Sequence, residues 1–249
     1  MLFRAWVWLA LATAPAGPTG TALVYQPQLE MHRTIVDALT NADRSIVAIA
    51  VSERWTSDAP PKKVIALGDA ALASASHRWP GRPLAAALVH APAPEAELTV
   101  SAAPDAACTV EALKSEPGRW LVLAAPDDAG AQALSTGLEA ELATGNPREL
   151  QAALRASEAD HVWLRAAPSL LNDTWFRYLG LLARGTTWVG SDAIGLAAYG
   201  LATPVQIDPV ATADRLRAWT KQRRRRHRKH EPVFEGSPCK APSSDPQPD

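Results

Sequence analysis

The stretch KKVIALGDAALASA, residues 62–75, decides the fold class of this chain. A short run of continuous apolar residues is followed by Gly68 and Asp69, and then by small residues. The first half has the character of a buried β-strand, because its apolar residues do not alternate with polar ones. The second half predicts a helix that begins near Asp69, whose carboxylate can cap the first turn. The stretch is therefore typical of one strand–turn–helix unit of an α/β protein.

The same unit recurs along the chain. The runs with strand character are Thr21–Tyr25, Ser45–Val51, Lys63–Leu67, Leu84–His90, Leu98–Ser101, Trp120–Ala124, His161–Arg165, Thr187–Gly190 and Val205–Ile207. The segments with helical spacing are Gln28–Thr40, Asp69–His77, Ala106–Lys114, Ala129–Thr144, Arg148–Ser157, Asn172–Ala183 and Ile194–Tyr199. Nearly continuous apolar strands that alternate with helices predict parallel sheets covered by helices on both faces.

A turn-rich stretch at residues 91–97 (APAPEAE) divides this pattern. We therefore expect an α/β protein with two doubly wound lobes and mainly parallel sheets. The first lobe is predicted over residues 22–90 and the second over residues 98–200. Residues 201–220 are a candidate for a return to the first lobe. The chain of 249 residues, with 47% hydrophobic and 20% charged residues, is long enough to bury cores of this size.

Residues 1–16 have the layout of a secretory signal peptide. Arg4 precedes a short apolar run, and Ala14 and Ala16 supply the small residues of a cleavage site. The alternative is a buried N-terminal strand or helix. The first interpretation predicts export to the periplasm, without a lipid anchor because no cysteine lies near the cut. No other stretch has the roughly 18 apolar residues that a membrane helix needs, so we expect no integral membrane segment after signal removal.

Residues 221–249 form a basic tail that contains KQRRRRHRKH and is rich in Pro and Ser. The tail carries a net charge of +4 within a chain of net charge −1. A contact with nucleic acid or anionic lipid is one interpretation of the arginines. The interpretation that we favour is a solvated, disordered tail without a nucleic-acid partner, because no aromatic residue interrupts the run. Cys108 and Cys239 are the two cysteines of the chain, and the place of Cys239 in this tail predicts no structural disulfide.

Catalytic patterns are missing from the sequence. It has no G-x-S-x-G, no phosphate loop, no H-E-x-x-H and no dinucleotide-binding G-x-G-x-x-G. Its histidines show no metal-ligand spacing. We therefore expect a protein that is not an enzyme and that has no catalytic residues, no metal and no cofactor.

The candidate binding residues follow the predicted strands, since open α/β sheets bind ligands at the carboxyl ends of their strands. Backbone N–H groups at Gly68, Asp69 and Ala70 are expected to point into a cleft, where the helix dipole favours an anionic group such as a carboxylate. Asp69 opposes an anion and suits an amino group. The alternative is an ordinary strand–helix turn. Similar turns follow His90 and the strand that begins at residue 161.

Several segments resemble the periplasmic-binding-protein-like substrate-binding proteins of ABC transporters. They are VIALGDAALASA (64–75), PLAAALVHAPAP (83–94), WLVLAAPDDAGAQAL (120–134) and the strand–Pro–helix succession of residues 159–209. Their order and spacing are similar to those of the family from about Leu23 to Pro209. The segment SERWTSDAPP, residues 52–61, departs from the pattern because it leaves too little room for a helix of the first lobe. The chain therefore resembles a trimmed relative.

The resemblance implies a type I binding-protein fold with a small-molecule cleft between two lobes and a membrane permease as partner. The ligand contacts that it implies are Gly68, Asp69, Ala70, His90, Ser101, Ser169, Ser191 and Asp192. The function that we expect is an exported solute-binding protein of an ABC-type uptake system, holding a small organic solute such as an amino-acid-like one. The alternative is a non-binding accessory or scaffold protein of an envelope transport system, which uses this fold and the basic tail for protein or lipid contacts.

Overall fold

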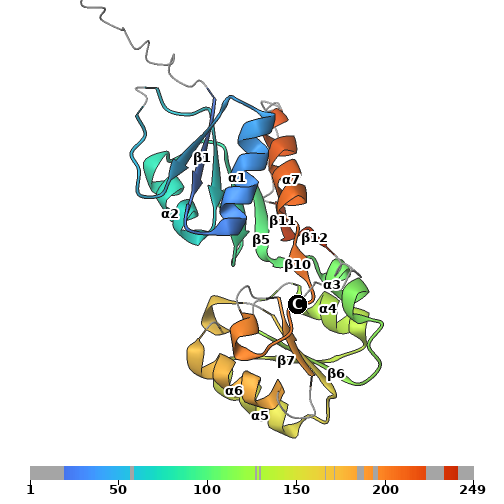
Figure 1. Cartoon of the computed structure of the whole chain (residues 1–249). Helices are drawn as coiled ribbons and strands as arrows, with labels where there is room; N and C mark the ends of the chain where they lie inside the picture. Colours follow the sequence, from blue (N-terminus) through green and yellow to red (C-terminus); the bar gives the residue numbers. More distant parts are fainter. Residues whose placement is uncertain are drawn as a thin grey trace, which may run out of the picture.

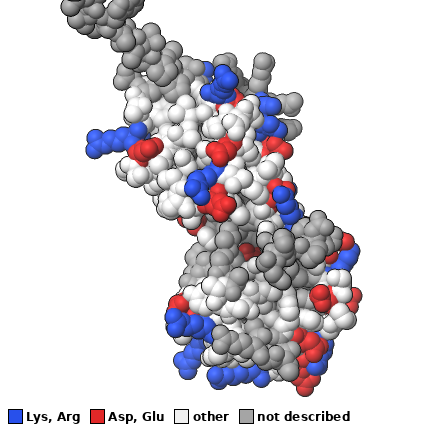
Figure 2. Space-filling model, in the orientation of Figure 1, with Lys and Arg blue, Asp and Glu red and all other residues white. Residues whose placement is uncertain are grey.

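Two parallel β-sheets organise the molecule, one in each half of Figure 1. The computed structural model describes residues 20–56, 59–126, 128, 130–165, 167–170, 172–183, 188–192, 196–222 and 233–240. The sheets belong to two lobes that are joined along one side, and the space-filling view narrows between them (Figure 2). The fold is therefore mixed α/β with two lobes and mainly parallel sheets, as the sequence predicts.

The first lobe contains a six-stranded parallel sheet. Its strands are β1 (Thr21–Tyr25), β2 (Ile46–Ala50), β3 (Lys63–Leu67), β4 (Leu84–Val89), β5 (Leu98–Pro104) and β11 (Val233–Ser237). They are arranged in the order β11-β5-β4-β3-β1-β2. The helices are α1 (Glu30–Ala42), α2 (Asp69–Arg78) and α7 (Pro209–Lys221). Helices α1 and α7 pack beside each other, while α2 contacts β1, β3 and β4.

Different side chains cover the two faces of this sheet. One core joins the sheet to α1 and α7 through large residues such as Leu23, Leu39 and Trp219. The other core, around α2, consists mostly of small residues such as Ala66 and Ala71. The end of α7 is fixed to β3, because Lys63 Nζ donates to the carbonyls of the last residues of this helix at 2.7–3.0 Å. Helix α7 therefore returns to the first lobe.

The second lobe contains a four-stranded parallel sheet in the order β7-β6-β8-β9. Its strands are β6 (Trp120–Ala124), β7 (Glu141–Thr144), β8 (His161–Leu164) and β9 (Trp188–Ser191). Its helices are α3 (Ala106–Leu113), α4 (Ala131–Leu138), α5 (Pro147–Ala156) and α6 (Asp173–Ala183), with short 3-10 helices η1 (Pro168–Leu170) and η2 (Leu196–Tyr199). One core of the sheet contacts α5 and α6, and the other contacts α3 and α4.

The chain passes between the lobes on one side of the molecule (Figure 1). The passages run from β5 to α3, through β10 (Gln206–Ile207) to α7, and from β11 to β12 (Cys239–Lys240). Strands β10 and β12 pair in antiparallel fashion. A disulfide between Cys108 and Cys239 attaches β12 to α3. We call this region the hinge.

The tail departs from the sequence prediction. Residues 221–249 were expected to be disordered, but residues 233–240 form β11 and β12. The expectation of no structural disulfide is wrong too, since Cys239 pairs with Cys108. The reason is backbone pairing: β11 adds to the edge of β5, and an edge strand needs no apolar sequence. Residues 1–19, which include the predicted signal peptide, and the basic residues 223–230 lie outside the described residues.

Two boundaries differ as well. Residues 98–104 were expected to begin the second lobe, but as β5 they pair with β4 in the first-lobe sheet. The predicted helix over residues 129–144 is divided into α4 and β7. Glu139 ends α4 because it adopts a left-handed φ of +52°, and the chain then follows β6 as a strand. Helical spacing alone did not reveal this break.

Candidate functional site

Two cavities lie at the carboxyl ends of the strands, one between the lobes and one on the first lobe. The interlobe cavity, of about 300 Å³, is lined by both lobes and by β11. The first-lobe cavity, of about 790 Å³, is lined by the first lobe and by the chain that leaves β10. His90 lines both cavities. We call the two cavities together the cleft.

The first-lobe cavity lies where β1 and β3 are neighbours in the sheet. Strand β1 leads to α1 on one face and β3 leads to α2 on the other, which opens a crevice between them. His32 is buried in this crevice, and its Nδ1 accepts a hydrogen bond from the backbone N–H of Gln26 at 3.3 Å. Burial lowers the pKa of His32 below its usual value of 6.5. The His32 ring therefore belongs to the cavity wall as a neutral group at pH 7.

Gly68 is required by this packing. Its φ of +84° is a left-handed conformation that favours glycine, and a Cβ there would lie 3.1 Å from Cε1 of His32. Its N–H donates to the carbonyl of Ala87 at 2.8 Å, so it continues the sheet and is not directed at a ligand, contrary to our expectation. Asp69 is the first residue of α2 and makes no capping hydrogen bond to its own helix.

Asp69 pairs instead with His90 at the edge of the cleft. Oδ2 of Asp69 lies 2.6 Å from Nδ1 of His90, and Oδ1 accepts the backbone N–H of His90 at 3.2 Å. In a neutral imidazole this arrangement keeps the proton on Nδ1 and leaves Nε2 as an acceptor. No partner of Nε2 is found among the described residues. His90 can therefore accept a hydrogen bond from a ligand.

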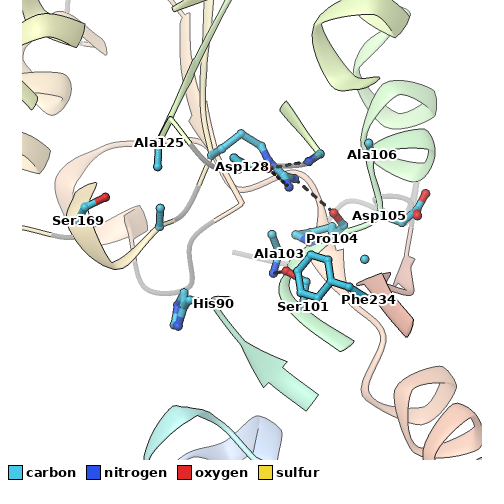
Figure 3. Close-up of a pocket in the computed structure, with 14 residues that line it drawn as sticks. His90, Ser101, Ala103, Pro104, Asp105, Ala106, Ala125, Asp128, Ser169 and Phe234 are labelled. Atoms are coloured by element: carbon cyan, nitrogen blue, oxygen red, sulfur yellow. Dashed lines mark hydrogen bonds and ion pairs between the residues drawn. The ribbon is translucent and has the colours of Figure 1, made fainter. Parts of the chain in front are cut away.

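The hinge side of the interlobe cavity is built from β5 and β11. Ser237 Oγ donates to the carbonyl of Ser101 at 2.5 Å, which fixes the two strands together. Oγ of Ser101 accepts the N–H of Ala103 at 3.0 Å. Phe234, on β11, also lines the cavity and is 37% exposed (Figure 3). The tail therefore supplies part of the cavity wall.

A buried arginine forms the second-lobe side of the interlobe cavity. Arg165 follows β8 directly, and its side chain is 6% exposed. Nε lies 3.0 Å from Oδ2 of Asp128, and Nη1 lies 3.0 Å from Oδ2 of Asp192. Burial by itself would lower the pKa of Arg165, but the carboxylates of Asp192 and Asp128 outweigh it and raise that pKa. The guanidinium is therefore a permanent cation held between two carboxylates.

The guanidinium also reaches the hinge. Nη1 donates to the carbonyl of Pro104, the last residue of β5, at 3.3 Å, and Nη2 donates to Oδ1 of Asp128 at 3.2 Å. The remaining N–H, on Nη2, has no partner among the described residues. A Cβ on Gly130 would lie 2.5 Å from Nη2, so glycine is needed there. Figure 3 shows dashed interactions running from this network to Asp128 and Pro104.

The structure places six of the eight predicted site residues in the cleft. Gly68, Asp69, Ala70 and His90 line the first-lobe cavity, and His90, Ser101 and Ser169 line the interlobe cavity. The other two are buried beneath the lining: Ser191 Oγ donates to the carbonyl of Leu164 at 2.9 Å, and Asp192 pairs with Arg165. Contact with a ligand stays a prediction for all eight.

Sequence reasoning missed Arg165, Asp128 and Phe234. A charged residue that ends the apolar run HVWLR, at the carboxyl end of a strand, is a signal that was available for Arg165. Asp128 gives no signal of its own in the sequence, because its role depends on the ion pair with Arg165. Nothing in the tail sequence indicates that Phe234 reaches the cleft.

Comparison with known proteins gives a likeness of fold. No protein-family model matches the chain, and no curated protein matches it. One similar structure is an ABC domain in complex with L-Trp from Streptococcus pneumonia. It is 11% identical in sequence to this chain, with a TM-score of 0.51, and the match covers 87% of this chain and 90% of that one. A ligand-free, open substrate binding protein with adhesive properties from Clostridium difficile is 10% identical, with a TM-score of 0.51 and coverages of 88% and 89%. A xylose-binding transcription activator is 14% identical, with a TM-score of 0.50 and coverages of 91% and 70%.

At these identities the likeness shows the fold, which is periplasmic binding protein type I-like. These neighbours are described as binding proteins or as a regulator, not as enzymes. No group of three or more His, Cys, Asp or Glu side chains in the described part of the chain is placed to hold a metal ion. No helix among the described residues combines the length and the apolar character needed to cross a bilayer.

Proposed function

We propose that the protein is an exported solute-binding protein of an ABC-type uptake system, which holds one small organic solute in the cleft. The observation that carries the proposal is the cleft itself. It lies at the carboxyl ends of strands from two sheets, with cavities of about 300 and 790 Å³, a size that suits small molecules. Proteins of similar fold are described as binding L-Trp or xylose.

The arrangement of the hinge supports binding by closure. The passages between the lobes all lie on one side of the molecule (Figure 1), an arrangement that allows the lobes to rotate about the hinge. Rotation about such a hinge encloses a ligand between two lobes and removes it from water. A permease that distinguishes the closed form from the open form is the partner that this function requires.

Export is part of the proposal. Both cysteines of the chain are joined in one disulfide, which is typical of proteins from an oxidising compartment. The apolar stretch and small residues within residues 1–16 fit a removed signal peptide. The test is the intact mass of the protein recovered from the periplasm: we expect a mature chain that begins at Gly17 and has no free thiol. A chain recovered only from the cytosol, with both thiols reduced, would contradict export.

Solute binding is tested by thermal denaturation with a panel of amino acids, amines, sugars and organic acids. A ligand at a hundredfold excess over its Kd stabilises the folded state by about 2.7 kcal/mol, which is a clear rise in Tm. We expect one chemical class to give this rise. Ala70→Trp, which fills the first-lobe cavity, should abolish it, whereas Ala73→Trp on the exposed surface of the same helix should not.

A panel without any rise in Tm would contradict solute binding. The accessory or scaffold function would then be the better account, and it predicts association with an envelope protein or lipid that weakens with salt and needs the basic tail. Titration with candidate partners at two ionic strengths separates the two functions.

A further inference from the structure

The charges around the cleft identify the class of solute. We infer that the cleft takes a small organic amine, protonated at neutral pH and without a carboxylate group, which carries a neutral oxygen such as a hydroxyl or carbonyl. This inference rests on the proposed function and goes further by excluding the anionic and zwitterionic solutes. It also departs from the carboxylate-bearing ligand that the sequence suggested.

Each α-helix whose first residues line the cleft has a carboxylate at or just before its start. Glu30 opens α1, Asp69 opens α2, Asp105 caps α3, Asp208 caps α7, and Asp128 precedes α4. The N-terminus of a helix attracts anions because of its free N–H groups and its dipole. At α3 and α4 those N–H groups are occupied by acidic side chains of the protein, and at α1 and α2 the carboxylates of Glu30 and Asp69 lie in the first turn. A carboxylate on the solute would therefore meet like charges instead of helix dipoles.

The hydrogen bonds of Asp105 and Asp128 show this occupation directly. Oδ1 of Asp105 accepts the N–H of Ala107 at 2.9 Å, at the start of α3. Oδ1 of Asp128 accepts the N–H groups of Gly130 and Ala131 at 2.8 and 3.1 Å, at the start of α4. These N–H groups already have anionic partners. They are therefore not available to hold a second anion.

Positive charge in the cleft does not balance these acids. Arg165 is the one Lys or Arg among the described residues that line the two cavities, and four carboxylates line them. The guanidinium is itself committed to Asp128 and to the buried Asp192. Glu30 has no basic partner among the described residues. The lining therefore carries an excess of negative charge, and an entering ammonium group would reduce it.

The hydrogen-bonding capacity of Arg165 provides a second observation that points to a ligand. The Arg165 side chain is more than nine-tenths buried, lines the interlobe cavity and has one N–H for which the described residues supply no partner. A buried donor of this kind favours an acceptor atom. Since two carboxylates already offset the charge of the guanidinium, a neutral oxygen suits the remaining N–H. The exposed ring of Phe234 adds an aromatic surface that an ammonium can contact.

The test is calorimetric titration with a matched four-carbon series at low and high salt. The probes are 4-amino-1-butanol, 1,4-diaminobutane, 4-aminobutyrate, succinate and 1,4-butanediol, and L-tryptophan and xylose are added as ligands of other classes. We expect 4-amino-1-butanol to bind most tightly and 1,4-diaminobutane, which has no oxygen to accept from Arg165, to bind more weakly. Both amines should bind more weakly at high salt than at low salt. The zwitterion, the dianion and the diol should bind at least about tenfold more weakly, the difference of one charge-assisted interaction.

Variants connect the binding to the cleft. Glu30→Gln and Asp69→Asn should each weaken the binding of 4-amino-1-butanol by about tenfold, because each removes a carboxylate from the lining. The matched control is Asp37→Asn, which removes the same charge from an exposed position of α1 outside both cavities. This control should leave the Kd within about twofold, the size expected of a distant exposed charge.

The outcomes distinguish a failure of the amine assignment from a failure of the proposed solute-binding function. Binding of succinate, 4-aminobutyrate, L-tryptophan or xylose without binding of either amine would overturn the amine assignment and leave solute binding in place. Amine binding that the control weakens as much as the cleft variants do would also overturn it, because the site would not be the cleft. Absence of binding by every probe would overturn the assignment and count against the proposed function.

Discussion

The two lobes present side-chain contacts of opposite kinds to the same cleft. In the second lobe, the side chains of Arg165, Asp128 and Asp192 are 6%, 11% and 0% exposed and are joined at about 3.0 Å. In the first lobe, the side chains of His90 and Asp69 are 26% and 54% exposed and lie 2.6 Å apart. Both sets follow the carboxyl ends of parallel strands. They differ in how much water surrounds them.

The difference indicates which half of the site is rigid. A buried ion pair is strongly destabilising when one partner is lost, because the other charge stays in a medium of low polarity. An exposed pair contributes little, because water can replace either partner. The second lobe therefore offers a preformed half-site, and the first lobe offers side chains that can change partners when a solute enters.

The largest effect should come from breaking the buried set. Arg165→Met leaves Asp128 and Asp192 without their cation and should lower the free energy of unfolding by about 3–5 kcal/mol. Urea denaturation followed by tryptophan fluorescence measures it. Arg177→Met is the matched control: its ion pair with Asp173 is exposed, so a change within about 1 kcal/mol is expected. Equal losses for both variants would refute the contrast between buried and exposed pairs.

Removal of the disulfide that joins the hinge strand β12 to α3 of the second lobe should have the next largest effect. Cys108→Ser combined with Cys239→Ser removes a link between residues 131 apart in the sequence. We expect a loss of about 2–4 kcal/mol, since the unfolded chain gains freedom. The wild-type protein in reducing buffer should unfold at the same urea concentration as the double variant. A wild-type protein that is insensitive to reductant would show that the hinge does not depend on the link.

A smaller effect should come from His32 in the wall of the first-lobe cavity. Because burial lowers its pKa, the folded protein binds fewer protons than the unfolded chain between that lowered pKa and 6.5. The free energy of unfolding should therefore fall as the pH is lowered through this window. His32→Asn should reduce the slope, and His77→Asn, at an exposed position, should not. Equal slopes in urea titrations of both variants would contradict the assignment.

The smallest effect on stability is expected for the exposed pair. Asp69→Asn should change the free energy of unfolding by less than about 1 kcal/mol, because water and the remaining backbone can satisfy His90. The same urea titration measures this change. A loss as large as that of Arg165→Met would mean that the first-lobe pair is a structural element, and the proposed division of the cleft into rigid and adaptable halves would be wrong.

Local sequence patterns predicted the elements of the fold, because the spacing of apolar residues that is typical of a strand or a helix involves residues close together in the chain. Strands β1, β3 and β6 begin and end where the apolar runs do. The strands of the tail could not be predicted in this way, because their contacts are with distant parts of the chain. Strand β11 pairs with β5, and a disulfide joins β12 to α3. The break after α4 depends on the left-handed conformation of one residue, Glu139, and the spacing of apolar residues does not indicate this conformation.

Part of the candidate site could also be predicted from the sequence. The rule that ligands bind beyond the carboxyl ends of strands led to Gly68, Asp69 and His90, all of which line the cleft. It did not lead to Arg165 as the centre of a network, because the partners of a buried charge come from other loops. Ser191 and Asp192 are buried beneath the residues that line the cleft, and a pattern along the chain does not distinguish buried residues from lining residues.

The position of β11 has a consequence for self-association. By covering the outer edge of β5, β11 hides a row of backbone donors and acceptors that would otherwise be open to any extended peptide. A chain that stops before Val233 would uncover this row in both copies of a colliding pair. The five residues of β11 thus contribute to keeping one copy from joining another.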